Sequence, residues 1–192
     1  VESDFVMDGA LFDELVKLPL DDGINAEVNL SFNDNVSVSV GNLMLVILSG
    51  VGSKDQDMQG VAIMLIQDLL QKEEKNCSFG HFNGFLTRRN LLYMRSIHKR
   101  RMGVFKEASK DLTEAIAIDK DFMKARVTRA ILWVLHGLKS SSKIHAEFKT
   151  VIEMAHKDSH YCAIAYSMLA TTILSDSRLG TYEDAKTYLE KA

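Results

Sequence analysis

Two stretches of the sequence share one pattern and decide the fold: Gly103–Asp119 reads GVFKEASKDLTEAIAID, and Gly180–Ala192 reads GTYEDAKTYLEKA. Each begins with glycine, has an aromatic residue two positions later, and has alanine five and twelve positions later. Alanine at such positions lets neighbouring helices approach closely, while the aromatic ring fills the remaining space. The pattern therefore predicts a repeated helix that packs tightly on its neighbours.

Weaker matches extend the repeat to other segments. Arg95-Ser96 places a bulky residue before a small one, and Arg129-Ala130 does the same 34 residues later. Together the copies resemble the tetratricopeptide repeat, in three imperfect copies over residues 89–192. The resemblance implies an all-α fold, an α-solenoid of antiparallel helix pairs. It also assigns repeat-packing roles to Gly103, Phe105, Ala108, Ala115, Ala130, Trp133, Ala170, Gly180, Tyr182 and Ala185.

The same resemblance implies a protein–protein interaction module that binds a partner peptide or helix on the concave face of the solenoid. The face would be lined by Asn90, Tyr93, Ile97, Arg100, Arg101, Lys124, Val127, Ile131 and Val134. Bases mixed with aliphatic residues suit an acidic, partly apolar partner, and the acidic segment Val1–Leu20 of this chain is one candidate. Chaperone carboxylate clamps use Lys, Asn or Arg where this chain has Tyr93, Ile97, Thr128, Ile164 and Met168, so no such clamp is expected.

Two other functional classes stay open. The chain could be a structural subunit of a large assembly, because solenoid ends need a solvated cap and the last copy reaches Ala192 without one. We therefore expect the natural chain to continue, or a partner to cover that end. A helical repeat that binds RNA is the other class, since residues 88–106 carry seven bases and no acid.

Composition agrees with a helical chain. The 192 residues include one proline, Pro19, and proline interrupts helices. No apolar run approaches the roughly 18 residues of a membrane span. Cys77 and Cys162 stand far apart without a CxxC spacing, which predicts reduced thiols in an intracellular, most simply cytoplasmic, protein. An organellar location stays open because the sequence begins at Val1 and a leader could have been removed.

Three regions precede or form the repeats. Residues 1–40 make an acidic arm, in which Glu27–Val40 alternates apolar and polar residues around an Asn33-Asp34-Asn35 turn. This alternation is typical of a β-hairpin, although a helix start is the alternative interpretation. Residues 41–88 are predicted to hold a helix pair, Leu43–Leu48 and Met58–Gln71, plus a linker, and form a possible degenerate repeat. Residues 89–192 hold the repeats.

No motif favours an enzyme, and no cofactor or metal is expected. Ser49–Lys54 contains two glycines but lacks the order of a phosphate-binding loop. His156, His160 and Cys162 are too few for a zinc site without a fourth ligand nearby. Ser140 and Lys143 match a serine–lysine spacing, but the companion motifs of that enzyme class are absent.

Overall fold

The computed structural model describes residues 27–29, 37–39, 47, 55–74, 87–155 and 160–192. Within it, Val1–Val104 and Phe105–Ala192 form two compact units, and each is described by itself. The predicted helix at Val1–Leu20, the Asn33–Asn35 turn, the glycine-containing Ser49–Lys54 segment and most of the linker lie outside the described residues. Cys77 and His156 do so as well.

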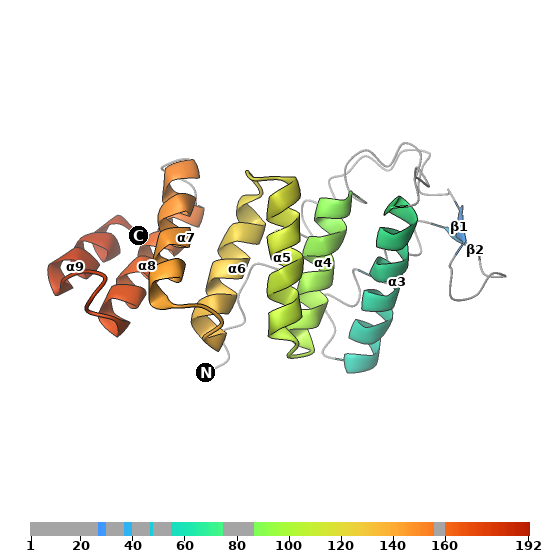
Figure 1. The fold of residues 1–192 in the computed structure, drawn as a ribbon, viewed down its shortest axis with the longest axis horizontal. Coiled ribbons are helices and arrows are strands. Elements are labelled where there is room, and N and C mark those ends of the chain that lie inside the picture. Colours follow the sequence, from blue (N-terminus) through green and yellow to red (C-terminus); the bar gives the residue numbers. More distant parts are fainter. Residues whose placement is uncertain (1–26, 30–36, 40–46, 48–54, 75–86, 156–159) are drawn as a thin grey trace. The chain divides into compact units, whose positions relative to one another are not determined.

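The described residues of the first unit include a short antiparallel strand pair and the helices α3 and α4 (Figure 1). Strands β1 (Glu27–Asn29) and β2 (Ser37–Ser39) pair with Val28 opposite Val38, which confirms the predicted hairpin pairing. Helix α3 (Gln56–Glu74) confirms the helix predicted at Met58–Gln71 and extends it at both ends. Of the helix predicted at Leu43–Leu48, only Ile47 is described, and it is helical.

Helices α3 and α4 (Arg88–Arg101) pack on each other in the first unit. Thr87 is the N-cap of α4, and its hydroxyl accepts a hydrogen bond from the Asn90 backbone N–H. The two helices are also joined by a buried polar contact, in which Nδ1 of His98 lies 2.6 Å from Oε1 of Gln59. The buried apolar side of α3 consists of Ala62, Leu65, Ile66, Leu69 and Leu70, at the i, i+3, i+4 spacing of an amphipathic helix.

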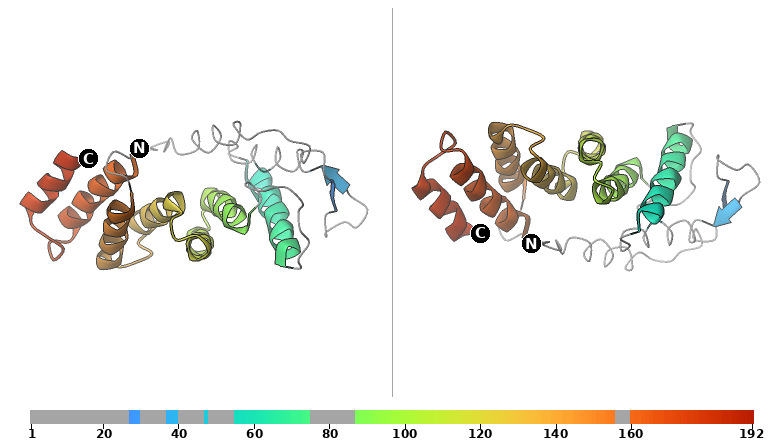
Figure 2. Two further views of the ribbon diagram at one scale, coloured as in Figure 1. Left: turned by 90° about the horizontal axis from the view of Figure 1, so that it is seen from above. Right: turned by 90° about the horizontal axis from the view of Figure 1, so that it is seen from below.

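In the second unit, residues 105–155 and 160–192 are described, and they form the helices α5 (Phe105–Ile118), α6 (Met123–His136), α7 (Ser141–Met154), α8 (His160–Ser175) and α9 (Tyr182–Lys191). Each packs on the next, and α6 also packs on α8 (Figure 2). This double contact of α6 holds α6, α7 and α8 around one core. The core consists of Val127, Ala130, Ile131, Trp133, Ile144, Phe148, Val151, Ala165 and Leu169.

Both predicted repeat glycines have a structural reason. Gly103 has φ +76°, a left-handed conformation that residues with a side chain rarely adopt. Gly180 leaves little space: a Cβ there would lie 3.2 Å from the Cδ1 atom of Ile173 and 3.2 Å from a carboxylate oxygen of Asp184. Each glycine therefore permits the turn that leads into a helix carrying the repeat pattern.

Candidate protein-interaction face

The small residues of the repeat pattern lie where the pattern requires. Ala108, Ala115, Ala130, Ala170 and Ala185 are all buried. A buried alanine on a packed helix lets the next helix approach to close distance. Burial of these five positions agrees with the register predicted from the two related stretches.

The aromatic residue of the repeat pattern is half-buried in one copy and exposed in another. In the second unit, Phe105 is half-buried and its ring stacks on His136 at the end of α6, with centroids 3.4 Å apart. The equivalent Tyr182 is 71% exposed, and its packing role stays a prediction. Phe105 is covered by α6, the helix that follows α5.

Four of the nine predicted partner-binding residues are buried, which corrects their assignment to an accessible face. Tyr93 and Ile97 lie among the buried residues of α4. Val127 and Ile131 belong to the core with Phe148 of α7 and with α8. The helical spacing places these residues on one face, but packing against neighbouring helices covers that part of it. The other five, which are Asn90, Arg100, Arg101, Lys124 and Val134, are half-buried, and partner binding by them stays a prediction.

Four half-buried apolar side chains of α6 and α8 pack against the core of the second unit: Val134, Tyr161, Ile164 and Met168. We call these four, together with the exposed Leu135 next to Val134 in α6, the α6–α8 face. Leu135 is its most accessible member, at 70% exposed. Leu135 was not among the predicted partner-binding residues, although it lies four positions after Ile131 and hence on the same side of α6. The face is apolar, and an apolar surface favours burial against a partner.

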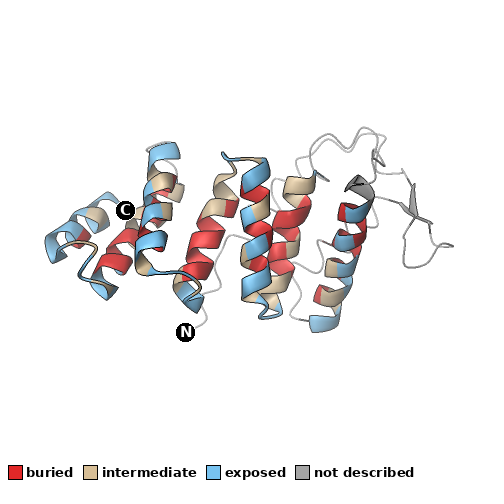
Figure 3. Cartoon of the chain, in the orientation of Figure 1, coloured by how far each residue is buried: buried red, intermediate tan, exposed pale blue. Residues whose placement is uncertain are grey.

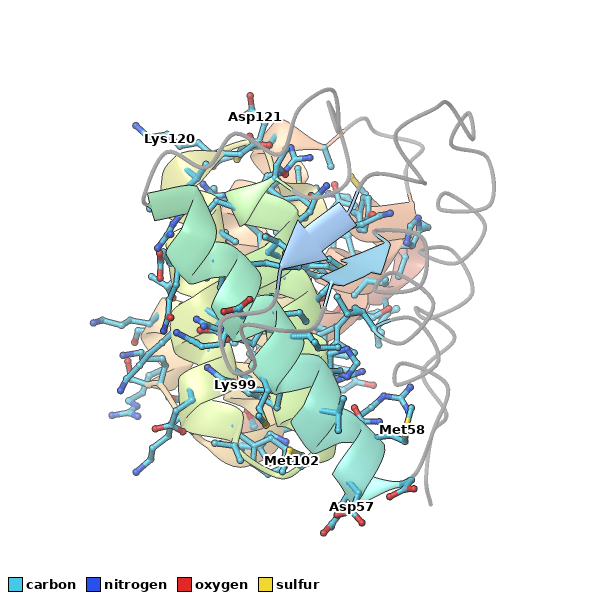
Figure 4. The ribbon with its side chains drawn as sticks, turned by 90° about the vertical axis from the view of Figure 1, so that its right-hand side faces the viewer. Asp57, Met58, Lys99, Met102, Lys120 and Asp121 are labelled. Atoms are coloured by element: carbon cyan, nitrogen blue, oxygen red, sulfur yellow. The ribbon has the colours of Figure 1, made fainter. Side chains whose placement is uncertain are left out.

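Two arginines and one glutamate connect α6 with both flanking helices. Arg126 and Arg129 of α6 donate hydrogen bonds to the same carboxylate oxygen of Glu147 on α7, at 3.2 and 2.8 Å. The three side chains are only 10–13% exposed. Arg126 also donates through Nε to the backbone carbonyl of Lys120, while the Lys120 side chain points outward at the α5–α6 turn (Figure 4). The network fixes the position of α6 relative to α7.

The same network reaches α5 through polar contacts. Arg129 donates to the Thr113 hydroxyl at 3.1 Å, and its guanidinium carbon lies 4.7 Å from the centroid of the Trp133 ring. The Trp133 indole N–H donates to the Ser109 hydroxyl at 2.8 Å. Trp133 was predicted as a packing residue, and it lies in the core. Its indole N–H also gives α6 a polar contact with α5.

His145 is a buried imidazole between α7 and α8. Its Nδ1 lies 3.5 Å from the Thr172 hydroxyl of α8. Burial lowers the pKa of His145 below its ordinary value of 6.5, and the positive charge of Lys149 lowers the pKa further. The folded chain therefore holds this residue as a neutral imidazole at neutral pH.

Acid should weaken the fold through His145. Because the folded pKa lies below the unfolded value of 6.5, the unfolded chain binds the proton first as pH falls. The free energy of unfolding should then decrease below pH 6.5, by at most about 1.4 kcal/mol per pH unit for one proton. Urea titrations of the native chain and of His145→Gln between pH 5 and 7.5 test this. Equal pH slopes for both chains would contradict it.

The α8–α9 turn is held by local charges. Arg178 donates to Asp176 at 2.8 Å, and this hydrogen bond lowers the pKa of Asp176 to about 2. Thr181 then caps α9: its side chain accepts from the Asp184 N–H, and the Asp184 carboxylate accepts from the Thr181 N–H. This reciprocal capping box fixes where α9 begins.

The described residues form no group of three or more His, Cys, Asp or Glu side chains that could hold a metal ion. Cys162 is buried, and His160 is exposed as the first residue of α8. None of the helices in the described part of the chain is long and apolar enough to cross a membrane.

Comparison with known proteins shows the fold. No family model matches the chain, and no curated protein matches it. Among solved structures, the crystal structure of MamA aligns with 78% of this chain and 75% of its own, at a TM-score of 0.55 and 14% identity. MamA is a helical solenoid of the tetratricopeptide type. This chain has the same kind of fold. This similarity confirms the predicted fold class, an all-α solenoid of antiparallel helix pairs.

Proposed function

We propose that the chain is a protein-interaction scaffold that holds a partner peptide or helix against the α6–α8 face. The observation that carries this is the accessible apolar surface formed by two helices that pack on each other, with Leu135 exposed at its edge. A tetratricopeptide-type fold supports it, because such folds present extended surfaces built from stacked helices. An amphipathic helix laid on an apolar groove is a common mode of peptide recognition.

One charge of the second unit suggests the character of the partner. Lys124 is half-buried in the first turn of α6, the helix that supplies Val134 and Leu135 to the α6–α8 face. A base on a helix that also exposes apolar side chains favours partners that combine acidic and apolar residues. We therefore propose an acidic, partly apolar segment as the ligand of this face.

Site-specific photo-crosslinking tests the proposal. A photoreactive phenylalanine analogue replaces Leu135 on the α6–α8 face or, as a control, the exposed Glu153 on α7. We expect crosslinks from position 135 to acidic peptides of one or a few proteins, identified by mass spectrometry, and at least fivefold fewer from position 153. Equal labelling from both positions would contradict the proposal. Crosslinks from position 135 mainly to RNA would support the rival RNA-binding function instead.

A further inference from the structure

Helix α6 carries two mostly buried arginines that share one carboxylate of the described chain. Arg126 and Arg129 donate to the same oxygen of Glu147, and the three side chains are 10–13% exposed. One carboxylate balances the charge of one guanidinium group, so the cluster of these three side chains keeps a net positive charge. Because a buried charge without a counter-ion is costly, the cluster favours a second anion.

The hydrogen bonds of the two arginines also leave room for a further acceptor. Each guanidinium group carries five N–H donors. The acceptors that they meet are Glu147, the Lys120 carbonyl and the Thr113 hydroxyl. The buried Nε of Arg129 has no hydrogen-bond partner among the residues that the structure describes. Thr113 is exposed, so an anion that reaches its hydroxyl also comes close to Nη1 of Arg129, 3.1 Å away.

Two exposed lysines of α5 stand beside the contacts that α5 makes with α6. Lys110 lies three residues before Thr113, which accepts from Arg129. Lys106 lies three residues before Ser109, whose hydroxyl accepts from the indole N–H of α6. Residues three apart share one side of a helix, so both lysines add positive charge next to the arginine pair.

Helix α7 adds one more base on the other side of α6. Lys143 is exposed and lies four residues, about one turn, before Glu147. α6 is mostly buried between α5 and α7, both of which have many exposed residues (Figure 3). We call the following set the basic seam: Lys106, Lys110, Thr113, Arg126, Arg129 and Lys143.

The basic seam is short. Glu107 lies three residues before Lys110 and Glu114 lies four residues after it, so acids border the seam along α5. Trp133, the aromatic ring nearest to Arg129, is only 7% exposed and offers no open face for a base to stack on. A long polyanion such as RNA is bound by an extended basic groove with exposed rings. The seam therefore suits one compact anion better than a nucleic acid.

We propose that the basic seam is a binding site for a single phosphate group, carried by a phosphoserine side chain or present as free phosphate. Guanidinium groups bind phosphate through paired hydrogen bonds, and the Thr113 hydroxyl and the lysines supply further donors. Clusters of arginine are a common device for binding phosphorylated segments. The seam shares no residue with the α6–α8 face, so this proposal stands independently of the proposed function.

Phosphorus NMR tests the site on the whole chain. The probes are inorganic phosphate and a glycine–alanine peptide with one phosphoserine. We expect a saturable change in chemical shift. Lys110→Met should weaken binding about fivefold, whereas Lys186→Met, at an exposed lysine of α9, should change it less than about 1.5-fold. Glu147→Gln should strengthen binding about threefold while it lowers stability, because the competing carboxylate charge is gone. A purely structural network would show the loss of stability without the gain in binding.

The two probes distinguish the sources of the phosphate group. Tighter binding of the phosphopeptide would assign the seam to a phosphorylated protein, and tighter binding of inorganic phosphate would assign it to the free anion. Circular dichroism checks that each variant keeps its helices. The proposal would be overturned by no saturable binding of either probe, or by equal losses from Lys110→Met and Lys186→Met. Equally strong competition by a peptide with glutamate in place of phosphoserine, or stronger competition by a short single-stranded RNA, would also overturn it.

Discussion

Replacing Phe148 by alanine should lower the free energy of unfolding by about 3–5 kcal/mol, the range for removing a buried phenylalanine. Phe148 is fully buried and belongs to the core that unites α6, α7 and α8. Its removal leaves a cavity where those three helices meet, and their backbones cannot close it fully. Urea unfolding followed by circular dichroism measures the change.

Phe105→Ala is the matched control for Phe148→Ala. Phe105 is half-buried and contacts His136 on one side, so its truncation removes the ring contact without opening an enclosed cavity. We expect a loss of about 1–2 kcal/mol, composed of partial burial and one aromatic pair. Equal losses from both substitutions would mean that the three helices do not share the core described above.

Replacing Glu147 by alanine should cost about 2–4 kcal/mol. Removal of the carboxylate leaves the guanidinium groups of Arg126 and Arg129 mostly buried without their shared acceptor. Leaving a buried charge without its partner destabilises a protein more than the intact ion pair stabilises it. Because these side chains are 10–13% exposed, water partly compensates the loss, and we expect a smaller effect than for a fully buried ion pair. Glu147→Gln keeps an acceptor oxygen and should lose less. Denaturant titration at neutral pH measures both.

Two comparisons isolate the network from general effects on α7. Glu153→Ala, at an exposed acid of the same helix, should change stability by less than about 0.5 kcal/mol. In a double-mutant cycle, Arg129→Met combined with Glu147→Leu should cost clearly less than the two single changes together, because the double change removes both charges of this pair and leaves only Arg126 without the shared acceptor. Additive losses would show that Arg129 and Glu147 do not interact.

The repeat pattern predicted much of the fold because its small-residue positions and turn residues reflect what local packing and backbone conformation require. The alanines at 108, 115, 130, 170 and 185 are small because a second helix must come close, and the structure buries all of them. The turn glycines at 103 and 180 are needed for a positive φ and for a close approach. Alternation around Asn33–Asn35 likewise predicted the pairing of β1 and β2. These properties depend on a residue and its near neighbours in the chain, so they can be predicted from the sequence alone.

The candidate site was predicted less well. Spacing along a helix places Val127, Ile131, Val134 and Leu135 on one side of α6, but it does not say how far neighbouring helices cover that side. The structure buries the first two in the core and leaves the last exposed. The charged network was missed for a related reason, because Glu147 lies 18 residues from Arg129 and no local pattern joins them.

The sequence by itself thus determined the helical class, the copies of the repeat, and which small residues must be buried, because helix period, capping and backbone conformation are set by local chemistry. Only the tertiary structure decided which apolar residues are core and which are surface, since burial depends on helices distant in sequence. Tyr182 and Phe105 occupy the same place in the same pattern, yet Phe105 stacks on a histidine and Tyr182 faces outward. The difference is the helix that follows α5 and covers it, which no local sequence pattern encodes.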